Sequence, residues 1–219
     1  MKVCFLTKKE KYGTREAISF VKKVMSHVDV YYCEFNTEFP KEIKDKEYDI
    51  IISYISTWIV PENVLIKTRY WNINFHPGSE YYPGIGCFNF ALYENAKEFG
   101  AVAHIMEPRV DMGKIICAEH FEISESENVE TLSIKTYKVI LKIFKYIITY
   151  IKENNVLPET HLNWKRKPFT RLELEELATI KCDMSKKELE HRIKSTYYPN
   201  KPGPFILLNG YKFEYNPNR

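Results

Sequence analysis

Three polar residues stand where side chains in α/β proteins often do chemistry. Asn74 and His76 alternate at the end of a strand-like run, so their side chains point to one face. Asp111 follows in a turn-rich loop between two later strand candidates. An amide, an imidazole and a carboxylate gathered at the carboxyl ends of strands would supply a hydrogen-bond donor, an acid and a base. Their spacing alone fits equally a strand cap, a loop histidine and a turn-forming aspartate.

The chain around these residues alternates between strand and helix patterns. Apolar runs of strand length predict six strands, at 2–7, 28–33, 49–55, 70–75, 101–106 and 114–123. Capping and stop residues predict four helices, one capped by Thr14, a short one opened by Pro61, one from about Gly86 to Phe99 that Gly100 stops, and a long one from Asn128 to about Asn154. This order predicts an α/β fold with a Rossmann-like open, mostly parallel twisted sheet.

The last sixty residues do not continue this alternation of strands and helices. A polar segment from Pro158 to Thr170 is typical of a linker or an extended arm. Short helices are expected at 171–178 and 185–195, and Asn209-Gly210 predicts a β-hairpin because this pair suits a type I′ turn. We therefore expect a catalytic domain over residues 1–157 and a small C-terminal helix and β-hairpin module over residues 158–219.

Composition narrows the class of protein. The 219 residues are 44% hydrophobic and carry a net charge of +3, which indicates a globular protein and argues against a nucleic-acid partner. Five scattered cysteines without a C-x-x-C pair argue against disulfides and a cysteine zinc site, and the histidines lack metal-ligand spacing. The N-terminal apolar run is too short for a signal peptide, and lysines interrupt the longer ones, so we expect no membrane segment and a cytoplasmic location.

Four short motifs occur in a fixed order between residues 72 and 116. They are Asn74-Phe75-His76-Pro77, Pro83-Gly84, Gly100 to His104, and Asp111-Met112-Gly113-Lys114-Ile115. This series resembles the 10-formyltetrahydrofolate-dependent formyltransferase family, where N-x-H-P precedes a P-G loop, a G-x-x-x-H strand and a D-x-G-x-I segment. The resemblance covers about residues 1–155 and is sharpest over 49–123. Val102 and Gly78 replace residues that many relatives carry, at places where substrate contacts could differ.

The resemblance implies catalytic roles for Asn74, His76 and Asp111. Attack of an amine on the formyl carbon gives an oxyanion, to which the Asn74 amide and a protonated His76 are suited to donate hydrogen bonds. Asp111 near His76 would favour the charged imidazole, and it could take a proton from the amine directly or through water. Such a transfer needs neither a covalent enzyme intermediate nor a metal.

The resemblance also implies 10-formyltetrahydrofolate as the formyl donor. In relatives the pterin lies in an apolar slot, which maps here to the segment around Trp58, Ile59 and Val60 and to the loop that holds His104, Ile105 and Asp111. Trp58 fits ordinary packing equally well, and His104 could order the Asp111 loop rather than contact the folate.

Three branches of the family differ in the amine that they formylate. Methionyl-tRNA formyltransferases carry a C-terminal β-barrel, for which sixty residues are too few, and glycinamide ribonucleotide formyltransferases lack such a tail. The loop after His76 and the segment from Arg192 to Phe205 look instead like sugar N-formyltransferases. The acceptor that this implies is a nucleotide-linked, dTDP-type amino-deoxy sugar for surface polysaccharide or O-antigen biosynthesis, with Gly78, Tyr82, Gly84 and Tyr198 as substrate-binding residues.

Alternatives to a sugar acceptor stay open at this point. They are Met-tRNA, glycinamide ribonucleotide and a folate-binding module without activity. Residues 161–219 hold 12 Lys and Arg against 7 Asp and Glu, a charge that would attract a nucleotide diphosphate. The basic run Lys165-Arg166-Lys167 fits a solvated linker as well, and Tyr198 could stack on a base or simply pack. Relatives often dimerise, so a homodimer through the exposed hairpin edge is a further expectation.

Overall fold

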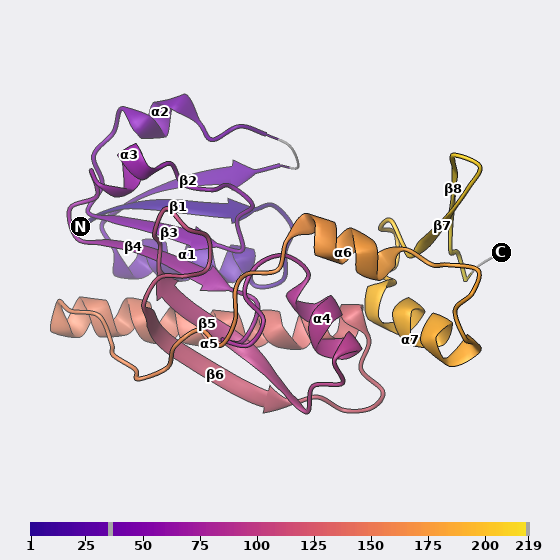
Figure 1. The fold of residues 1–219 in the computed structure, drawn as a ribbon. Coiled ribbons are helices and arrows are strands. Elements are labelled where there is room, and N and C mark those ends of the chain that lie inside the picture. The colour runs from indigo at the N-terminus through magenta and orange to yellow at the C-terminus, as the bar shows by residue number, and fades with distance from the viewer. Residues whose placement is uncertain (35–36, 218–219) are drawn as a thin grey trace.

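The computed structural model describes residues 1–34 and 37–217, and its centre is a six-stranded sheet (Figure 1). The strand order is β2-β1-β3-β4-β5-β6. The first four strands pair in parallel, whereas β5 is antiparallel to β4 and β6 is antiparallel to β5. The strands are β1 (Lys2–Lys8), β2 (His27–Cys33), β3 (Ile50–Tyr54), β4 (Trp71–His76), β5 (Glu98–Ile105) and β6 (Ile115–Glu122). The predicted α/β class with a mostly parallel sheet is confirmed.

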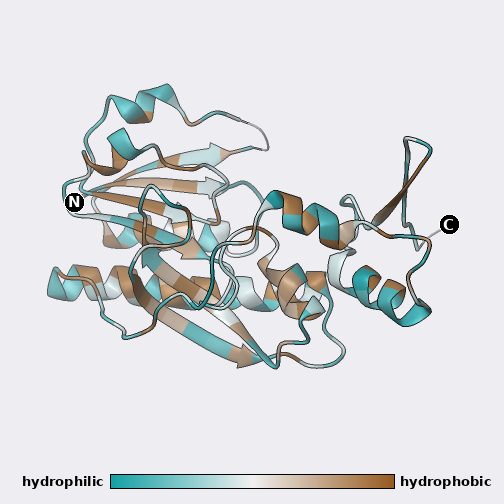
Figure 2. Ribbon diagram, viewed as in Figure 1, coloured by the Kyte–Doolittle hydropathy of each residue, from teal (hydrophilic) through white to brown (hydrophobic). Residues whose placement is uncertain are grey.

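Helices cover both faces of this sheet. The long helix α5 (Val129–Asn154) and α1 (Thr14–Val24) pack against one face, where Phe5, Tyr54, Phe75 and Phe144 form an aromatic core. The short helices α2 (Lys41–Lys44) and α3 (Glu62–Leu65) bury Ile43, Val64 and Leu65 on the opposite face. Brown strands between teal outer helix surfaces show this layering in Figure 2. The two inner strands β1 and β3 are therefore apolar on both sides, as their sequences require.

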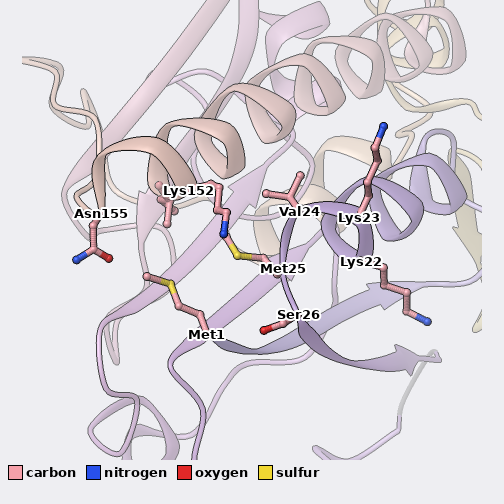
Figure 3. A pocket seen from close by; sticks show the side chains of 9 residues that line it. Met1, Lys22, Lys23, Val24, Met25, Ser26, Lys152 and Asn155 are labelled. Atoms are coloured by element: carbon pink, nitrogen blue, oxygen red, sulfur yellow. The ribbon is translucent and has the colours of Figure 1, made fainter.

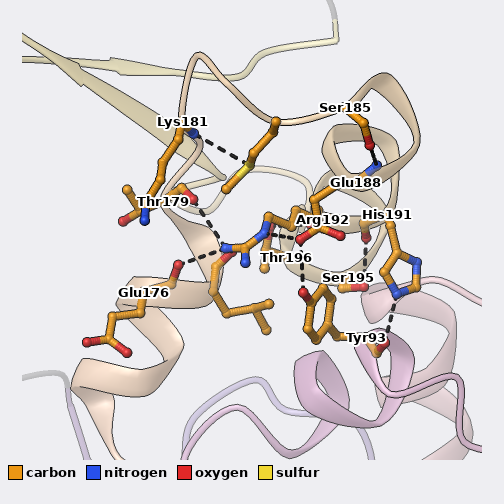
Figure 4. A network of polar contacts seen from close by, with 12 residues as sticks. Tyr93, Glu176, Thr179, Lys181, Ser185, Glu188, His191, Arg192, Ser195 and Thr196 are labelled. Atoms are coloured by element: carbon orange, nitrogen blue, oxygen red, sulfur yellow. Dashed lines mark hydrogen bonds and ion pairs between the residues drawn. The ribbon is translucent and has the colours of Figure 1, made fainter.

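The C-terminal part attaches to α4 (Cys87–Tyr93) through α7 (Lys186–Thr196). Arg192 of α7 donates hydrogen bonds to the carbonyl oxygens of Glu176, Leu177 and Thr179 at the C-terminal end of α6 (Arg171–Ala178) (Figure 4). The Arg192 Nε–H donates to Glu188, which also accepts from the Tyr93 hydroxyl. One guanidinium thus joins both C-terminal helices, and Glu188 connects them to the main sheet domain.

The hairpin of β7 (Phe205–Leu208) and β8 (Tyr211–Glu214) has the predicted bounds. Asn209 and Gly210 both adopt positive φ, at 49° and 82°, as a type I′ turn demands. The predicted cap at Asn128 is confirmed too, with a capping box to Thr131, and Ser185 caps α7 as expected. The boundary between residues 157 and 158 stays a prediction.

Two predicted helix limits are wrong. The helix expected to reach Phe99 ends at Tyr93, where Asn95 leaves it with φ 52°, and residues 98–100 belong to β5. Gly100 does not stop a helix, because a side chain there would collide with the Glu119 carbonyl of β6, so it permits close strand approach. At the first helix the cap is Gly13, and Thr14 is already the first helical residue.

Candidate active site

Asn74, His76 and Asp111 meet at the carboxyl end of β4. Asp111 Oδ1 accepts a hydrogen bond from the Asn74 amide at 3.3 Å and lies 3.1 Å from His104 Nε2. Asp111 Oδ2 lies 3.2 Å from His76 Nδ1. All four side chains come within direct contact through this one carboxylate, although they are spread over 37 residues of sequence.

The sheet fixes three of the four positions. Asn74 and His76 lie on the same face of β4, and the antiparallel register places His104 of β5 opposite Asn74. Asp111 comes from the loop between β5 and β6 and adopts φ 48°, a left-handed conformation that aspartate tolerates better than most residues. The loop thereby turns the carboxylate back over the end of the strand.

Both ring nitrogens of His76 face oxygen acceptors. Nδ1 points to Asp111, and Nε2 lies 2.9 Å from the backbone carbonyl of Tyr82. A neutral imidazole donates from one nitrogen only, so only the imidazolium satisfies both acceptors. Gly78 makes this arrangement possible, because a Cβ there would lie 2.6 Å from both His76 Nε2 and the Tyr82 carbonyl.

Asp111 is held in its charged form. Burial alone would raise the pKa of Asp111, but the charge of His76, the hydrogen bond and charge of His104 and the N–H of Gly84 lower this pKa well below its ordinary value. The Gly84 N–H donates to Oδ2 at 2.8 Å. The Gly84 N–H, the Asn74 amide and the two imidazoles around this buried carboxylate therefore favour an ionised Asp111 at neutral pH.

Trp164 also lies at this site, although no local pattern in the sequence singled it out. It lies in the extended segment 158–170, which runs from α5 across the site to α6 (Figure 1). Its indole N–H donates to the Gly113 carbonyl at 2.8 Å, and its ring stands edge-on to His76 and His104, with centroids 5.9 and 5.2 Å away. The only available signal was a single tryptophan in an otherwise polar stretch.

The loop after His76 contains three of the residues predicted to bind substrate. Gly78 lies against His76, and the Gly84 N–H binds Asp111. The buried ring of Tyr82 packs between Phe99 and Phe169. The fourth predicted residue, Tyr198, comes from the C-terminal module and packs, half-buried, against the same apolar cluster that contains Tyr82. A substrate role for the four stays a prediction.

The two segments predicted to hold the pterin come together in one apolar cluster. Trp58 and Val60 from the loop after β3 pack in the same cluster as Met106, which follows β5. Trp58 is anchored by Phe39 and by a hydrogen bond from its indole to the Thr37 carbonyl. Ile59 between them is exposed by 68%. Ile105, the last residue of β5, is half-buried and accepts a hydrogen bond from His104.

A cavity apart from this site lies between the C-terminal ends of α1 and α5 (Figure 3). Met1, Lys23 and Lys152 line it, but the ammonium groups of Lys22 and Lys23 point away from one another. Within residues 1–34 and 37–217, no three His, Cys, Asp or Glu side chains are placed to hold a metal ion. In the same residues no helix has the length and apolarity needed to cross a bilayer.

Sequence comparison supports the site's chemistry. The profile of the formyl transferase family matches residues 2–146. A methionyl-tRNA formyltransferase from Caldanaerobacter subterraneus is 26% identical over 125 residues, which are 57% of this chain and 40% of that protein. The chain thus spans less than half the length of this curated relative.

Solved structures of low sequence identity share the fold over almost the whole chain. A 4-N formyltransferase from Francisella tularensis superposes with a TM-score of 0.76 at 21% identity, covering 98% of this chain and 96% of that one. An N-formyltransferase from Helicobacter canadensis, solved with folinic acid and dTDP-3-aminofucose, gives a TM-score of 0.73 at 16% identity, covering 97% and 86%. The family profile spans the strands, the loop and the four side chains that meet at Asp111, and the chain therefore belongs to the formyl transferase family.

Proposed function

We propose that this protein transfers a formyl group from 10-formyltetrahydrofolate to the amino group of a nucleotide-linked amino-deoxy sugar, of which a dTDP-sugar is the favoured case. The observation that carries the proposal is the contact of Asn74, His76 and Asp111 at one strand end, with Asp111 ionised and His76 facing two acceptors. A surface polysaccharide such as O-antigen would be the product's destination.

The residues can serve the two charges that formyl transfer creates. Negative charge develops on the formyl oxygen, and the Asn74 amide and the His76 imidazolium are the donors that stabilise it. Both groups now bind Asp111, and His76 also binds the Tyr82 carbonyl, so a direct bond to that oxygen requires one of these contacts to open. Catalytic hydrogen bonds commonly rearrange in this way when substrate enters.

The proton released by the attacking amine needs an acceptor. Asp111 is ionised and buried beside both donors, and it can take this proton directly or through a water molecule. Trp164 covers His76 and His104 and limits the access of bulk water, which would otherwise compete with the amine for the formyl group.

The apolar cluster of Trp58, Val60 and Met106 fits the pterin of the folate, which supplies the formyl group when bound. Beside it on β4, Asn72 has a buried side-chain oxygen without a hydrogen-bond partner, which fits a polar ring edge. His104 and Ile105 would border the same slot from β5. Residues 1–157 would thus hold the donor, and the loop 77–84 with the 158–219 module would hold the acceptor.

The choice of a sugar acceptor draws on the solved structures. The Francisella and Helicobacter enzymes match this chain through its C-terminal module, and the latter was solved with a dTDP-linked amino sugar. The match to the methionyl-tRNA formyltransferase covers 57% of this chain and 40% of that protein, so most of that relative has no counterpart in the comparison.

A direct assay tests the proposal. The protein is incubated with 10-formyltetrahydrofolate and, in turn, dTDP-linked 4-amino and 3-amino-6-deoxy sugars, glycinamide ribonucleotide and Met-tRNA. We expect formylation of at least one sugar and none of the other two. Turnover of glycinamide ribonucleotide or Met-tRNA without any sugar would contradict the sugar assignment, and folate binding without any transfer would indicate an inactive module.

A further inference from the structure

Three lysines without acidic partners lie near one another beyond the carboxyl end of β1. Lys8 ends the strand, Lys11 follows in the loop to α1, and Lys201 comes from a turn of the C-terminal module. Within residues 1–34 and 37–217 no ion pair with a carboxylate is found for any of the three, and the Lys11 ammonium lies 5.5 Å from the centre of the Tyr137 ring of α5. Lys9 differs, since it pairs with Glu34 at 3.9 Å.

These charges disfavour one another. Burial lowers the pKa of Lys8, Cys33 partly opposes this, and the charge of Lys201 lowers it further. Burial likewise lowers the pKa of Lys11, and the charges of Lys8 and Lys201 add to the effect. Half-buried cations that repel each other weaken the fold, and a ligand of opposite charge would relieve this cost.

Within the part of the chain that the structure describes, two unsatisfied hydroxyls lie at the start of α1, the helix that follows Lys11. The helix α1 has 11 residues and starts there with Gly13 as a cap that offers no side-chain hydrogen bond. The hydroxyls of Thr14 and Tyr54 are buried without partners, and Tyr54 Oη lies 3.1 Å from the position of a Cβ on Gly13. Free N–H groups at a helix start together with orphaned hydroxyls are suited to anion binding.

The sheet register places this cluster at a useful distance from the proposed catalytic residues. Thr7 of β1 is level with Tyr54 of β3, and Tyr54 is level with Phe75 of β4. Lys8 therefore lies in the same row as His76, two strand spacings or roughly 10 Å away. A sugar ring that carries an amine on one side and a phosphate on the other spans a gap of this size.

We propose that Lys8, Lys11 and Lys201 bind the diphosphate of the nucleotide-linked acceptor and so place its amino sugar beside Asn74 and His76. This assignment rests on the proposed function. It also replaces the basic run at 165–167 as the phosphate contact, because Arg166 already pairs with Glu94 at 2.7 Å and stacks on Phe169. In the C-terminal module, Lys201 is then the cation that reaches the acceptor.

Binding of inorganic pyrophosphate tests the site without any turnover. We expect calorimetry to show binding to the wild-type protein and a dissociation constant raised about threefold to tenfold in Lys8→Met and in Lys201→Met. Lys9→Met is the matched control, since it removes a neighbouring cation that is already paired, and it should bind like the wild type. Absence of binding to the wild type, or equal loss in Lys9→Met, would overturn the site.

Steady-state kinetics distinguish the acceptor from the other anion in the reaction, the glutamate tail of the folate. With a sugar that is formylated, Lys8→Met and Lys201→Met should raise KM for the acceptor and leave KM for 10-formyltetrahydrofolate unchanged. A rise in the folate KM alone would assign the lysines to that tail and refute the proposal. Failure of every sugar, with pyrophosphate binding as expected, would remove the proposed function and leave the anion site in place.

Thermal unfolding separates binding from folding. Because Lys8 is half-buried and repelled by its neighbour, Lys8→Met should unfold at the same or a higher temperature than the wild type. A variant that lost pyrophosphate binding together with a large drop in unfolding temperature would show that the lysine acts on the fold, and this would count against the proposal.

Discussion

The six-stranded sheet and the two-stranded hairpin differ in what completes them. Helices from the same chain cover both faces of the large sheet, and Asn74, His76 and His104 all contact Asp111. The hairpin leaves Leu207, Leu208, Tyr211 and Phe213 each more than half exposed. An isolated hairpin with this much open apolar surface lacks the cover that such hairpins need. The site is thus built within one chain, whereas the module has a surface suited to a partner.

Removing a site residue should have the largest effect. We expect Asp111→Asn and His76→Ala to lower kcat by about a hundredfold or more, because each removes a proton acceptor or donor from the reacting centre. Assays with the formylated sugar measure this, and folate binding in the same variants shows that the domain is intact. Unchanged turnover in both variants would rule out the catalytic roles.

Charging the hairpin should act on assembly and leave the site alone. If two copies associate through this surface, Phe213→Glu should weaken dimerisation at least tenfold, because it places a charge in an apolar contact. Light scattering over a concentration series measures the effect. Lys212→Glu changes charge on the same strand and is the control for electrostatics alone. A wild-type protein that stays monomeric at every concentration would disprove a homodimer.

Acid should distinguish the buried carboxylate from exposed ones. The native-state pKa of Asp111 is lowered, so its contribution to the free energy of unfolding is complete above its unfolded pKa, about 4. That contribution is lost as the pH falls below this value toward the native pKa. Urea unfolding should show the wild type more stable than Asp111→Asn at pH 6, with the difference shrinking at pH 3. A difference independent of pH would contradict the assigned charge.

The smallest effect on turnover is expected from Trp164 in the extended segment 158–170. Trp164→Phe keeps an aromatic ring against both imidazoles but loses the hydrogen bond to Gly113, so we expect kcat to fall severalfold, corresponding to about 1 kcal/mol. Trp164→Ala should cost more and should raise the ratio of 10-formyltetrahydrofolate hydrolysis to transfer. An unchanged ratio in Trp164→Ala would show that the indole does not limit water access.

Much of this architecture could be predicted because its signals are local. The strand at 50–54 is apolar throughout, the cap at Asn128 sits three residues before its reciprocal partner, and Asn209-Gly210 encodes its own turn. Asn74 and His76 follow from strand periodicity, and the ordered motifs added Asp111. The close approach of Asn74, His76 and Asp111 could therefore be predicted from the sequence.

Other features depend on contacts that no local pattern reports. Gly100 fits a helix stop in the sequence, but its role is set by the Glu119 carbonyl on a neighbouring strand. Asn95 ends the helix through a left-handed conformation that its type permits without requiring. Trp164 reaches the site from 51 residues beyond Gly113, along a segment with no periodicity. Likewise, the charge of Lys201 acts on Lys11 only because the turn that holds Lys201 comes back to the loop between β1 and α1.

The segment 158–170 crosses the loop after β4 at Gly84, and this contact bears on the order in which the parts of the chain are synthesised. Phe169 pairs with Gly84 as a short parallel bridge so close that a side chain on Gly84 would strike it, and the N–H of Gly84 is bound to Asp111. During synthesis the sheet and the Asp111 loop emerge well before Phe169 does. The proposed catalytic groups therefore leave the ribosome before the segment 158–170 that covers them.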